Sequence, residues 1–166
     1  WRFNKDENVS KVYAAPGNPG MKNVECIDIT DFEELADFAI ANDIGLTMVG
    51  PEIHLCAGIV DVFKAKGLKI FGPDKEAAQL EGSKSYCKDF MVKYDIPTAE
   101  SATFSNEADA LAYIAEKGAP IVVKADGLAA GKGVTVAETN EQANEAIKDC
   151  FEGSFGEAGY KVVIEE

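Results

Sequence analysis

Residues 121–136 read IVVKADGLAAGKGVTV, and this stretch indicates the fold more strongly than any other part of the chain. A β-branched run ends at Lys124, a loop of small residues follows, and a second β-branched run begins at Val134. The pattern predicts two strands joined by a glycine-rich loop, with Lys132 near its tip. Glycines let backbone N–H groups approach phosphate oxygens, and lysines supply positive charge. We therefore predict a hairpin that can close over a polyphosphate, with a flexible structural hairpin as the alternative.

Two other phosphate-binding motifs do not fit this loop. A Walker loop needs glycine, four residues, and then Gly-Lys-Ser/Thr. Counted from Gly127, the second glycine position holds Lys132, and the next residue, Gly133, offers no hydroxyl for magnesium. The loop also leads into a strand, whereas the dinucleotide fingerprint needs a helix to receive the pyrophosphate.

Composition and charge limit the class of protein. With 166 residues, 46% of them hydrophobic, the chain suits one domain, or one domain and part of a second. No run approaches the ~18 apolar residues of a membrane helix. The net charge of −13 argues against a nucleic-acid or anionic-membrane surface. The four cysteines are widely spaced: Cys26, Cys56, Cys87 and Cys150. They form no CxxC pair, so we predict free thiols in a reducing cytoplasm, and the single His54 cannot build a multi-histidine metal site.

Strand-like runs alternate with helical patterns, which predicts an α/β fold with a mainly parallel sheet. In the first part, strands are predicted at 12–15, 24–29, 46–49 and 68–71, and helices at 31–41, 52 to about 66, and 83–94. Thr30 or Asp31 can cap the first helix and Ser83 the last. Ligands gather at the carboxyl ends of strands in such sheets, so the turns at Gly17 and Gly50 are candidate ligand loops, with ordinary βα turns as the alternative.

The second part of the chain predicts a different arrangement of helices and strands. Helices are predicted at 106–116 and 141–151, and strands at 121–124, 134–137 and 161–165. Two helices on a small, mostly antiparallel sheet would form a lid-like α+β module. We place the boundary near residues 103–106, which divides the chain into 1–104 and 105–166.

Five segments, in order and at sensible spacing, carry a resemblance to a known family: 14–20 (AAPGNPG), 49–52 (VGPE), 71–73 (FGP), 78–84 (AQLEGSK) and 124–133 (KADGLAAGKG). Together they closely resemble the phosphoribosylamine–glycine ligase family of ATP-grasp enzymes, over essentially the whole chain. The resemblance implies a parallel open-sheet N-terminal domain that binds phosphoribosylamine, followed by an incomplete ATP-grasp lid. It also implies a monomeric, cytoplasmic parent enzyme of de novo purine synthesis, with no nucleic-acid or membrane partner.

The reaction that the resemblance implies joins glycine to 5-phosphoribosylamine and gives glycinamide ribonucleotide, ADP and phosphate. ATP would first convert the glycine carboxylate into a glycyl phosphate, because a free carboxylate has only oxide as its leaving group. Magnesium and lysines would offset the charge on the transferring phosphoryl group, and a closing lid would exclude water.

The resemblance also implies an ATP site. Lys88 and Lys124 look like the two nucleotide lysines, and the hinge strand with Glu165 and Glu166 looks like the adenine site. The phosphate flap would consist of Asp126, Gly127, Leu128, Ala129, Ala130, Gly131, Lys132 and Gly133. The alternatives are a solvated Lys88, a Lys132 that touches phosphate only on closure, and an ordinary exposed strand end at the two glutamates.

A phosphoribosylamine pocket is implied by the remaining segments. It would include Pro16, Gly17, Asn18, Gly20, Gly50, Pro51, Glu52, Ser83 and Lys84. Glu52 could accept from ribose hydroxyls or the amine, or it could simply cap the next helix. Lys84 could instead be a surface lysine, and His54 we interpret as a helix-start residue and not a general base.

Both ends of the chain indicate a piece of a longer protein. The chain starts at Trp1 without Met or a signal-peptide pattern, and it stops at Glu166 on a strand-like run. The family begins with a strand and a glycine-rich turn that would precede Trp1, and its magnesium ligands and glycine site would follow Glu166. We therefore assign no catalytic residue and no metal ligand within this chain, and expect it to be inactive alone.

Two other functions stay open. Another ATP-grasp ligase of a carboxylate and an amine would share the glycine loop and the paired lysines. A non-catalytic nucleotide-binding regulatory domain is the alternative from a different class, and the presence of both lysines and the hinge glutamates counts against it.

Overall fold

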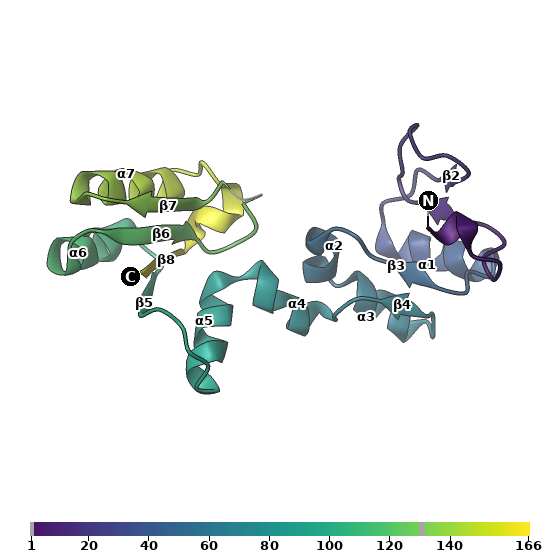
Figure 1. Cartoon of the computed structure of the whole chain (residues 1–166), viewed down its shortest axis with the longest axis horizontal. Helices are drawn as coiled ribbons and strands as arrows, with labels where there is room; N and C mark the ends of the chain where they lie inside the picture. The colour runs from purple at the N-terminus through teal and green to yellow at the C-terminus, as the bar shows by residue number, and fades with distance from the viewer. Residues whose placement is uncertain (1, 130–131) are drawn as a thin grey trace. The chain divides into compact units, whose positions relative to one another are not determined.

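The computed structural model describes residues 2–129 and 132–166, apart from the side chain of Glu157. The chain has an α/β fold and forms two compact units (Figure 1). The first unit comprises residues 1–50 and 58–72, and the second comprises residues 51–57 and 73–166. The sequence analysis divided the chain after residue 104 according to the expected function of each part, and that division stays a prediction.

The first unit contains two separate pairs of short parallel strands. β1 (Tyr13–Ala14) pairs with β2 (Glu25–Cys26), and β3 (Thr47–Met48) pairs with β4 (Ile70–Phe71). The predicted strand positions and parallel direction are confirmed, but the predicted lengths and the single sheet are wrong for this unit. Each of these strands has one partner, and two residues of each predicted run enter the hydrogen-bonded ladder.

Two helices supply the core of the first unit. These are α1 (Phe32–Ala41) and α3 (Ile59–Ala65), and a short 3-10 helix, η1 (Phe3–Lys5), precedes them. The buried apolar residues of the two helices are Ala36, Ala39, Ile59, Val60 and Phe63. Because the apolar residues recur at helical spacing, each helix buries one stripe and leaves its other face in water.

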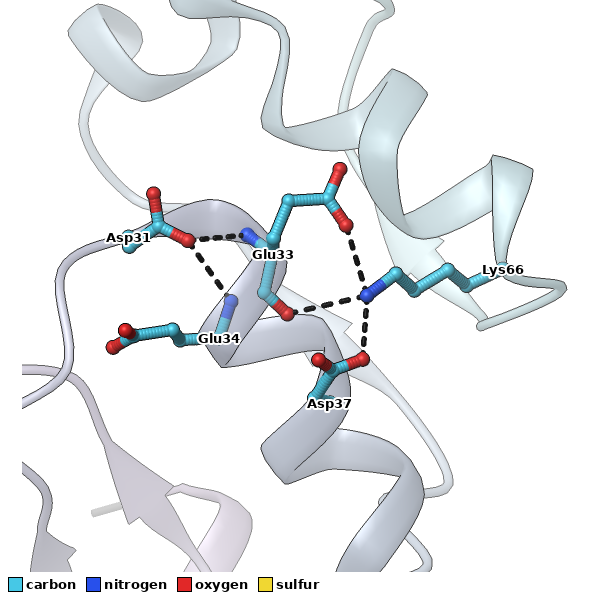
Figure 2. A network of polar contacts seen from close by, with 5 residues as sticks. All are labelled: Asp31, Glu33, Glu34, Asp37 and Lys66. Atoms are coloured by element: carbon cyan, nitrogen blue, oxygen red, sulfur yellow. Dashed lines mark hydrogen bonds and ion pairs between the residues drawn. The ribbon is translucent and has the colours of Figure 1, made fainter.

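A polar network joins these helices at the start of α1 (Figure 2). Asp31 caps α1, as predicted, since its Oδ1 accepts from the N–H groups of Glu33 and Glu34 at 2.9 and 3.0 Å. Lys66, which follows α3, places its Nζ 2.8 Å from Glu33 Oε2 and 2.5 Å from Asp37 Oδ1. Both carboxylates are exposed, so this network orients α3 on α1 more than it stabilises the unit.

The helix predicted from 52 to about 66 is wrong as a single element. Gly58 has a φ of +95°, a left-handed conformation that interrupts the helix. The first part becomes α2 (Glu52–Ala57), which packs on α4 (Lys75–Gly82) in the second unit. The sequence analysis missed α4, although Asp74 caps it by accepting from Ala77 N–H at 2.9 Å. α5 (Lys84–Lys93) then follows with Ser83 as its cap, which confirms that prediction.

The second unit ends in a four-stranded antiparallel sheet of order β5-β8-β6-β7. Its strands are β5 (Ser101–Phe104), β6 (Ile121–Ala125), β7 (Val134–Ala137) and β8 (Val162–Glu165), and its helices are α6 (Glu107–Lys117), α7 (Asn140–Phe151) and the 3-10 helix η2 (Gly156–Tyr160). α6 and α7 lie side by side and share one core with the sheet (Figure 1). The predicted α+β module is confirmed, including its hairpin.

Two further properties bear on function. The four cysteines are free, as their spacing predicted, with Cys26 exposed and Cys150 buried. Within residues 2–129 and 132–166, none of the helices combines the length and the apolar character that crossing a bilayer requires.

Candidate nucleotide site

The pleat of the sheet sends two functional side chains to the same face. On β6, Ile121, Val123 and Ala125 are buried in the core, so Lys124 points to the opposite face. Lys124 is paired with Val163 on β8, and Glu165 is two residues further along the same face. This diagonal placement lets Lys124 Nζ form an ion pair with Glu165 Oε1.

A second lysine reaches the same carboxylate from α5. Lys88 Nζ pairs with Glu165 Oε2 and donates to Thr98 Oγ1 at 2.7 Å and to the carbonyl of Ala99 at 3.1 Å. All three ammonium donors of Lys88 therefore have partners. The Lys88 side chain is 15% exposed and that of Glu165 is 11% exposed. The alternatives of a solvated Lys88 and an exposed strand end at Glu165 are thus wrong.

These residues line a cavity of about 500 Å³, a size typical of small-molecule sites. Its lining residues are Leu80, Glu81, Lys84, Cys87, Lys88, Met91, Thr98, Ala99, Lys124, Val163 and Glu165. Three lysines face two glutamates, so the cavity is locally positive in a chain of net charge −13. Burial, with the nearby charges of Lys88 and Lys84, lowers the pKa of the Lys124 ammonium group. An anionic ligand would offset this surplus of positive charge.

The glycine loop begins and ends on close backbone contacts. The N–H of Ala125 donates to the carbonyl of Gly133 at 2.8 Å, which closes the hairpin. A Cβ on Gly127 would lie 2.9 Å from Ala158, and one on Gly133 would lie 2.7 Å from the Cβ of Ala129, so both positions require glycine. Leu128 and Ala129 are half-buried.

The tip of the loop carries the remaining predicted flap residues. Lys132 is exposed, and its N–H donates to the carbonyl of Ala129 at 2.9 Å. The predicted residues Ala130 and Gly131 lie outside the described residues. A role of this tip in closing over phosphate stays a prediction.

Ser83 and Lys84 lie against the base of this loop. Both oxygens of the Asp126 carboxylate lie 3.2 Å from Ser83 Oγ, and Lys84 Nζ donates to the carbonyl of Gly127 at 3.2 Å. The sequence analysis assigned Ser83 and Lys84 to the phosphoribosylamine pocket, and that assignment stays a prediction. Lys84 is not an isolated surface lysine, because it lines the same cavity as Lys88 and Lys124.

Glu166 differs from its neighbour Glu165. Its side chain is 58% exposed and its Oε1 lies 3.7 Å from Lys117 Nζ, while its N–H donates to the carbonyl of Glu100 at 3.1 Å. Strand alternation sends it away from the cavity face that holds Glu165. The predicted adenine contact of Glu166 stays a prediction.

The predicted phosphoribosylamine turns belong to different units. In the first unit, the Ala15–Pro16 peptide is cis, and Asn18 Oδ1 accepts from Gly20 N–H at 2.9 Å. A Cβ on Gly17, whose φ is +73°, would lie 2.5 Å from Cys26 Sγ. Gly50 ends the first segment of the first unit, and Pro51 and Glu52 begin the short segment of the second unit. Glu52 is the first residue of α2, and His54, which the sequence analysis interpreted as a helix-start residue, is the third residue of the same helix.

Several cavity residues were missed by the sequence analysis. Thr98 and Ala99 anchor Lys88, and Leu80 and Met91 supply apolar lining. The only signal for the first pair was Pro97, which ends the preceding helical pattern. Among the residues that the structure describes, no group of three or more His, Cys, Asp or Glu side chains could hold a metal ion.

Two family models match the chain. Residues 82–166 match the phosphoribosylglycinamide synthetase ATP-grasp (A) domain, and residues 1–81 match the phosphoribosylglycinamide synthetase N domain. The chain belongs to the phosphoribosylglycinamide synthetase family. The resemblance carried by the five sequence segments is thereby confirmed.

Curated members of the phosphoribosylglycinamide synthetase family align over the whole chain. A phosphoribosylamine–glycine ligase of Pasteurella multocida (strain Pm70) is 57% identical over 173 residues, and one of Escherichia coli (strain K12) is 53% identical over 173 residues. Each alignment covers 100% of this chain and 40% of the relative. The chain thus spans less than half the length of these relatives.

Solved structures agree with the family assignment. The crystal structure of phosphoribosylamine–glycine ligase from Thermotoga maritima matches with a TM-score of 0.70 and 30% identity, covering 94% of this chain and 37% of that one. A biotin carboxylase from Campylobacter jejuni, in complex with β,γ-ATP, matches with a TM-score of 0.74 and 17% identity, covering 93% and 38%. The second likeness concerns the fold alone.

Proposed function

We propose that this chain is part of an enzyme that joins glycine to 5-phosphoribosylamine, using ATP and passing through a glycyl phosphate. The observation that carries the proposal is the positive cavity in which Lys88 and Lys124 pair with Glu165 and which Lys84 also lines. Relatives with 57% and 53% identity that carry the ligase name support this choice of substrates. Since the chain spans 40% of those relatives, the activity is proposed for the whole protein that contains it.

The residues of the cavity fit a nucleoside triphosphate. Lys88 and Lys124 would exchange the Glu165 carboxylate for phosphate oxygens, which gives each lysine a new anionic partner. Glu165 would then be free to accept from an exocyclic amino group of the base. The N–H groups of the glycine loop, with Lys132, would cover the phosphates and exclude water from the acyl phosphate. ATP supplies the phosphoryl group that activates the glycine carboxylate.

The rest of the assignment follows from these roles. We propose that residues 105–166 act as an ATP-grasp lid and residues 1–104 as a phosphoribosylamine-binding domain. The proposed substrate contacts are Pro16, Gly17, Asn18, Gly20 and Gly50 in the first unit, and Pro51 and Glu52 in the second. We propose a cytoplasmic, monomeric enzyme with magnesium as the cation that accompanies ATP, and the four free thiols agree with a reducing compartment.

The test is ADP release by the full-length protein that carries this sequence. It would be supplied with magnesium ATP, glycine and freshly made phosphoribosylamine, and one component would be omitted at a time. Release that needs both glycine and phosphoribosylamine, and that collapses in Lys124→Ala, is the expected result. Glu166→Gln is the matched control, because its carboxylate lies outside the cavity.

Two other results would replace the proposal. ADP release with a different acid or amine would indicate an ATP-grasp ligase that acts on a different substrate. Binding of ATP without release under any pairing would favour a regulatory nucleotide-binding domain.

A further inference from the structure

Asp126 lies where strand β6 meets the glycine loop, and its polar atoms already have partners within the protein. Its Oδ1 accepts from Ser85 N–H at 2.6 Å and its Oδ2 from Ser85 Oγ at 2.9 Å, in addition to the contacts with Ser83 Oγ. Its carbonyl accepts from Lys84 N–H and its N–H donates to the carbonyl of Lys161, both at 3.0 Å. Ser85 is only 8% exposed, so the main partner of this carboxylate is buried.

These contacts cap helix α5 from outside the helix. The first N–H groups of a helix have no intrahelical acceptor and form its positive end. In α5, the N–H of Lys84 donates to the backbone carbonyl of Asp126, and the N–H of Ser85 donates to the Asp126 carboxylate. The N–H of Tyr86 donates to Ser83 Oγ at 3.1 Å. A carboxylate that is 41 residues distant along the chain from Ser85 therefore completes the cap.

The helix held in this way carries two of the cavity lysines. Lys84 and Lys88 are four residues apart, so they lie on one face of α5. Lys124 lies two residues before Asp126 on β6. The clamp between Asp126 and the start of α5 thus sets how far the α5 lysines lie from Lys124. The bond from Lys84 Nζ to the carbonyl of Gly127 ties the same helix to the first residue of the loop.

We propose that Asp126 is a positioning residue, which clamps α5 to the base of the glycine loop and holds Lys84 and Lys88 opposite Lys124. In this role its carboxylate contacts neither the nucleotide nor a metal ion, unlike the ATP contact that the family resemblance implied for the whole loop. The inference rests on the proposed function for the identity of the anion that the lysines bind.

The kinetic test compares substitutions at Asp126 in the full-length protein. Asp126→Ala should lower kcat/KM for ATP by about 10- to 100-fold, because small misplacements of binding groups have effects of this size. Asp126→Asn should recover most of the loss, since an amide still accepts from Ser85 N–H. Ser85→Ala should reproduce part of it, and should not add to the loss in the double variant with Asp126→Ala.

A second measurement does not depend on the ligase reaction. Hydrogen exchange should become faster at the N–H groups of Lys84 and Ser85 in Asp126→Ala, and the affinity for ADP should fall. Asp31→Ala is the matched control, because Asp31 also caps a helix through two N–H groups but α1 carries no cavity residue. It should lower the melting temperature without changing ADP affinity.

Three outcomes would overturn the inference. Equal losses of ADP affinity in Asp126→Asn and Asp126→Ala, with Lys84 and Ser85 still protected, would indicate direct contact with nucleotide or metal. Unchanged ADP affinity in Asp126→Ala would leave only a stabilising role. If Asp126→Ala does not fold, full ADP affinity in Ser85→Ala would also overturn it. Absence of turnover in the unmodified protein would overturn the proposed function alone.

Discussion

Replacing Glu165 with glutamine removes the carboxylate that two lysines share. The side chains of Glu165, Lys88 and Lys124 are 11%, 15% and 24% exposed, so water screens these charges poorly. Removing one partner of a buried ion pair costs about 3–5 kcal/mol, and the partial exposure of Lys124 favours the lower end, about 3 kcal/mol. For an unfolding unit of roughly 150–250 residues, this corresponds to a fall in melting temperature of about 6–12 °C.

The assay is thermal and urea unfolding of the full-length protein at pH 7, with Glu166→Gln measured in parallel. The Glu166 side chain is 58% exposed and its Oε1 lies 3.7 Å from Lys117 Nζ, so its loss should change stability by less than about 0.5 kcal/mol. Equal melting temperatures for the two variants would refute the reasoning, because Glu165 would then not neutralise the cavity lysines.

Three other predictions follow from the same structure. Gly127→Ala should lower the free energy of unfolding in urea by about 1–3 kcal/mol, because the new Cβ would overlap Ala158 of η2. Gly45→Ala, where the space around the Cβ is open, should leave it nearly unchanged. An equally small effect of Gly127→Ala would show that the base of the loop is loosely packed. Ile147→Ala should cost about 2–5 kcal/mol, since Ile147 is fully buried between α7 and the sheet, and a loss under 1 kcal/mol would contradict that packing. The lowered pKa of Lys124 means that the folded protein loses this proton before the unfolded chain does, so the contribution of Lys124 to stability should rise with pH from its folded pKa up to 10.5. The free energy of unfolding of the unmodified protein, relative to that of Lys124→Met, should therefore increase from pH 7 to 10, and a constant difference would contradict the lowered pKa.

The hairpin and the helix caps were predictable because they depend on neighbouring residues. The glycine loop, the β-branched runs around it and the caps Asp31 and Ser83 are local patterns, and the structure contains each of them. The long helix after Glu52 was wrongly predicted because a single glycine within an apolar pattern is usually tolerated. Only the backbone shows that Gly58 adopts a left-handed conformation there.

The short strands of the first unit illustrate a second limit. β-branched runs indicate where strands lie, but the number of residues that enter a ladder depends on the partner strand. In the described first unit, each strand has one partner, and predicted runs of four to six residues yield ladders of two residues.

The candidate site, like the fold, was only partly predictable from the sequence. The sequence by itself determined the α/β class and the lysine-bearing loop, because residue types and spacing carry that information, and its resemblance to a known family implied the choice of Lys88, Lys124 and Glu165. Only the tertiary structure decided that these three side chains meet, since their contacts depend on the antiparallel register of β6 and β8 and on the placement of α5. It also placed the Asp126 carboxylate on the start of α5, a contact between residues 41 positions apart that no local pattern encodes.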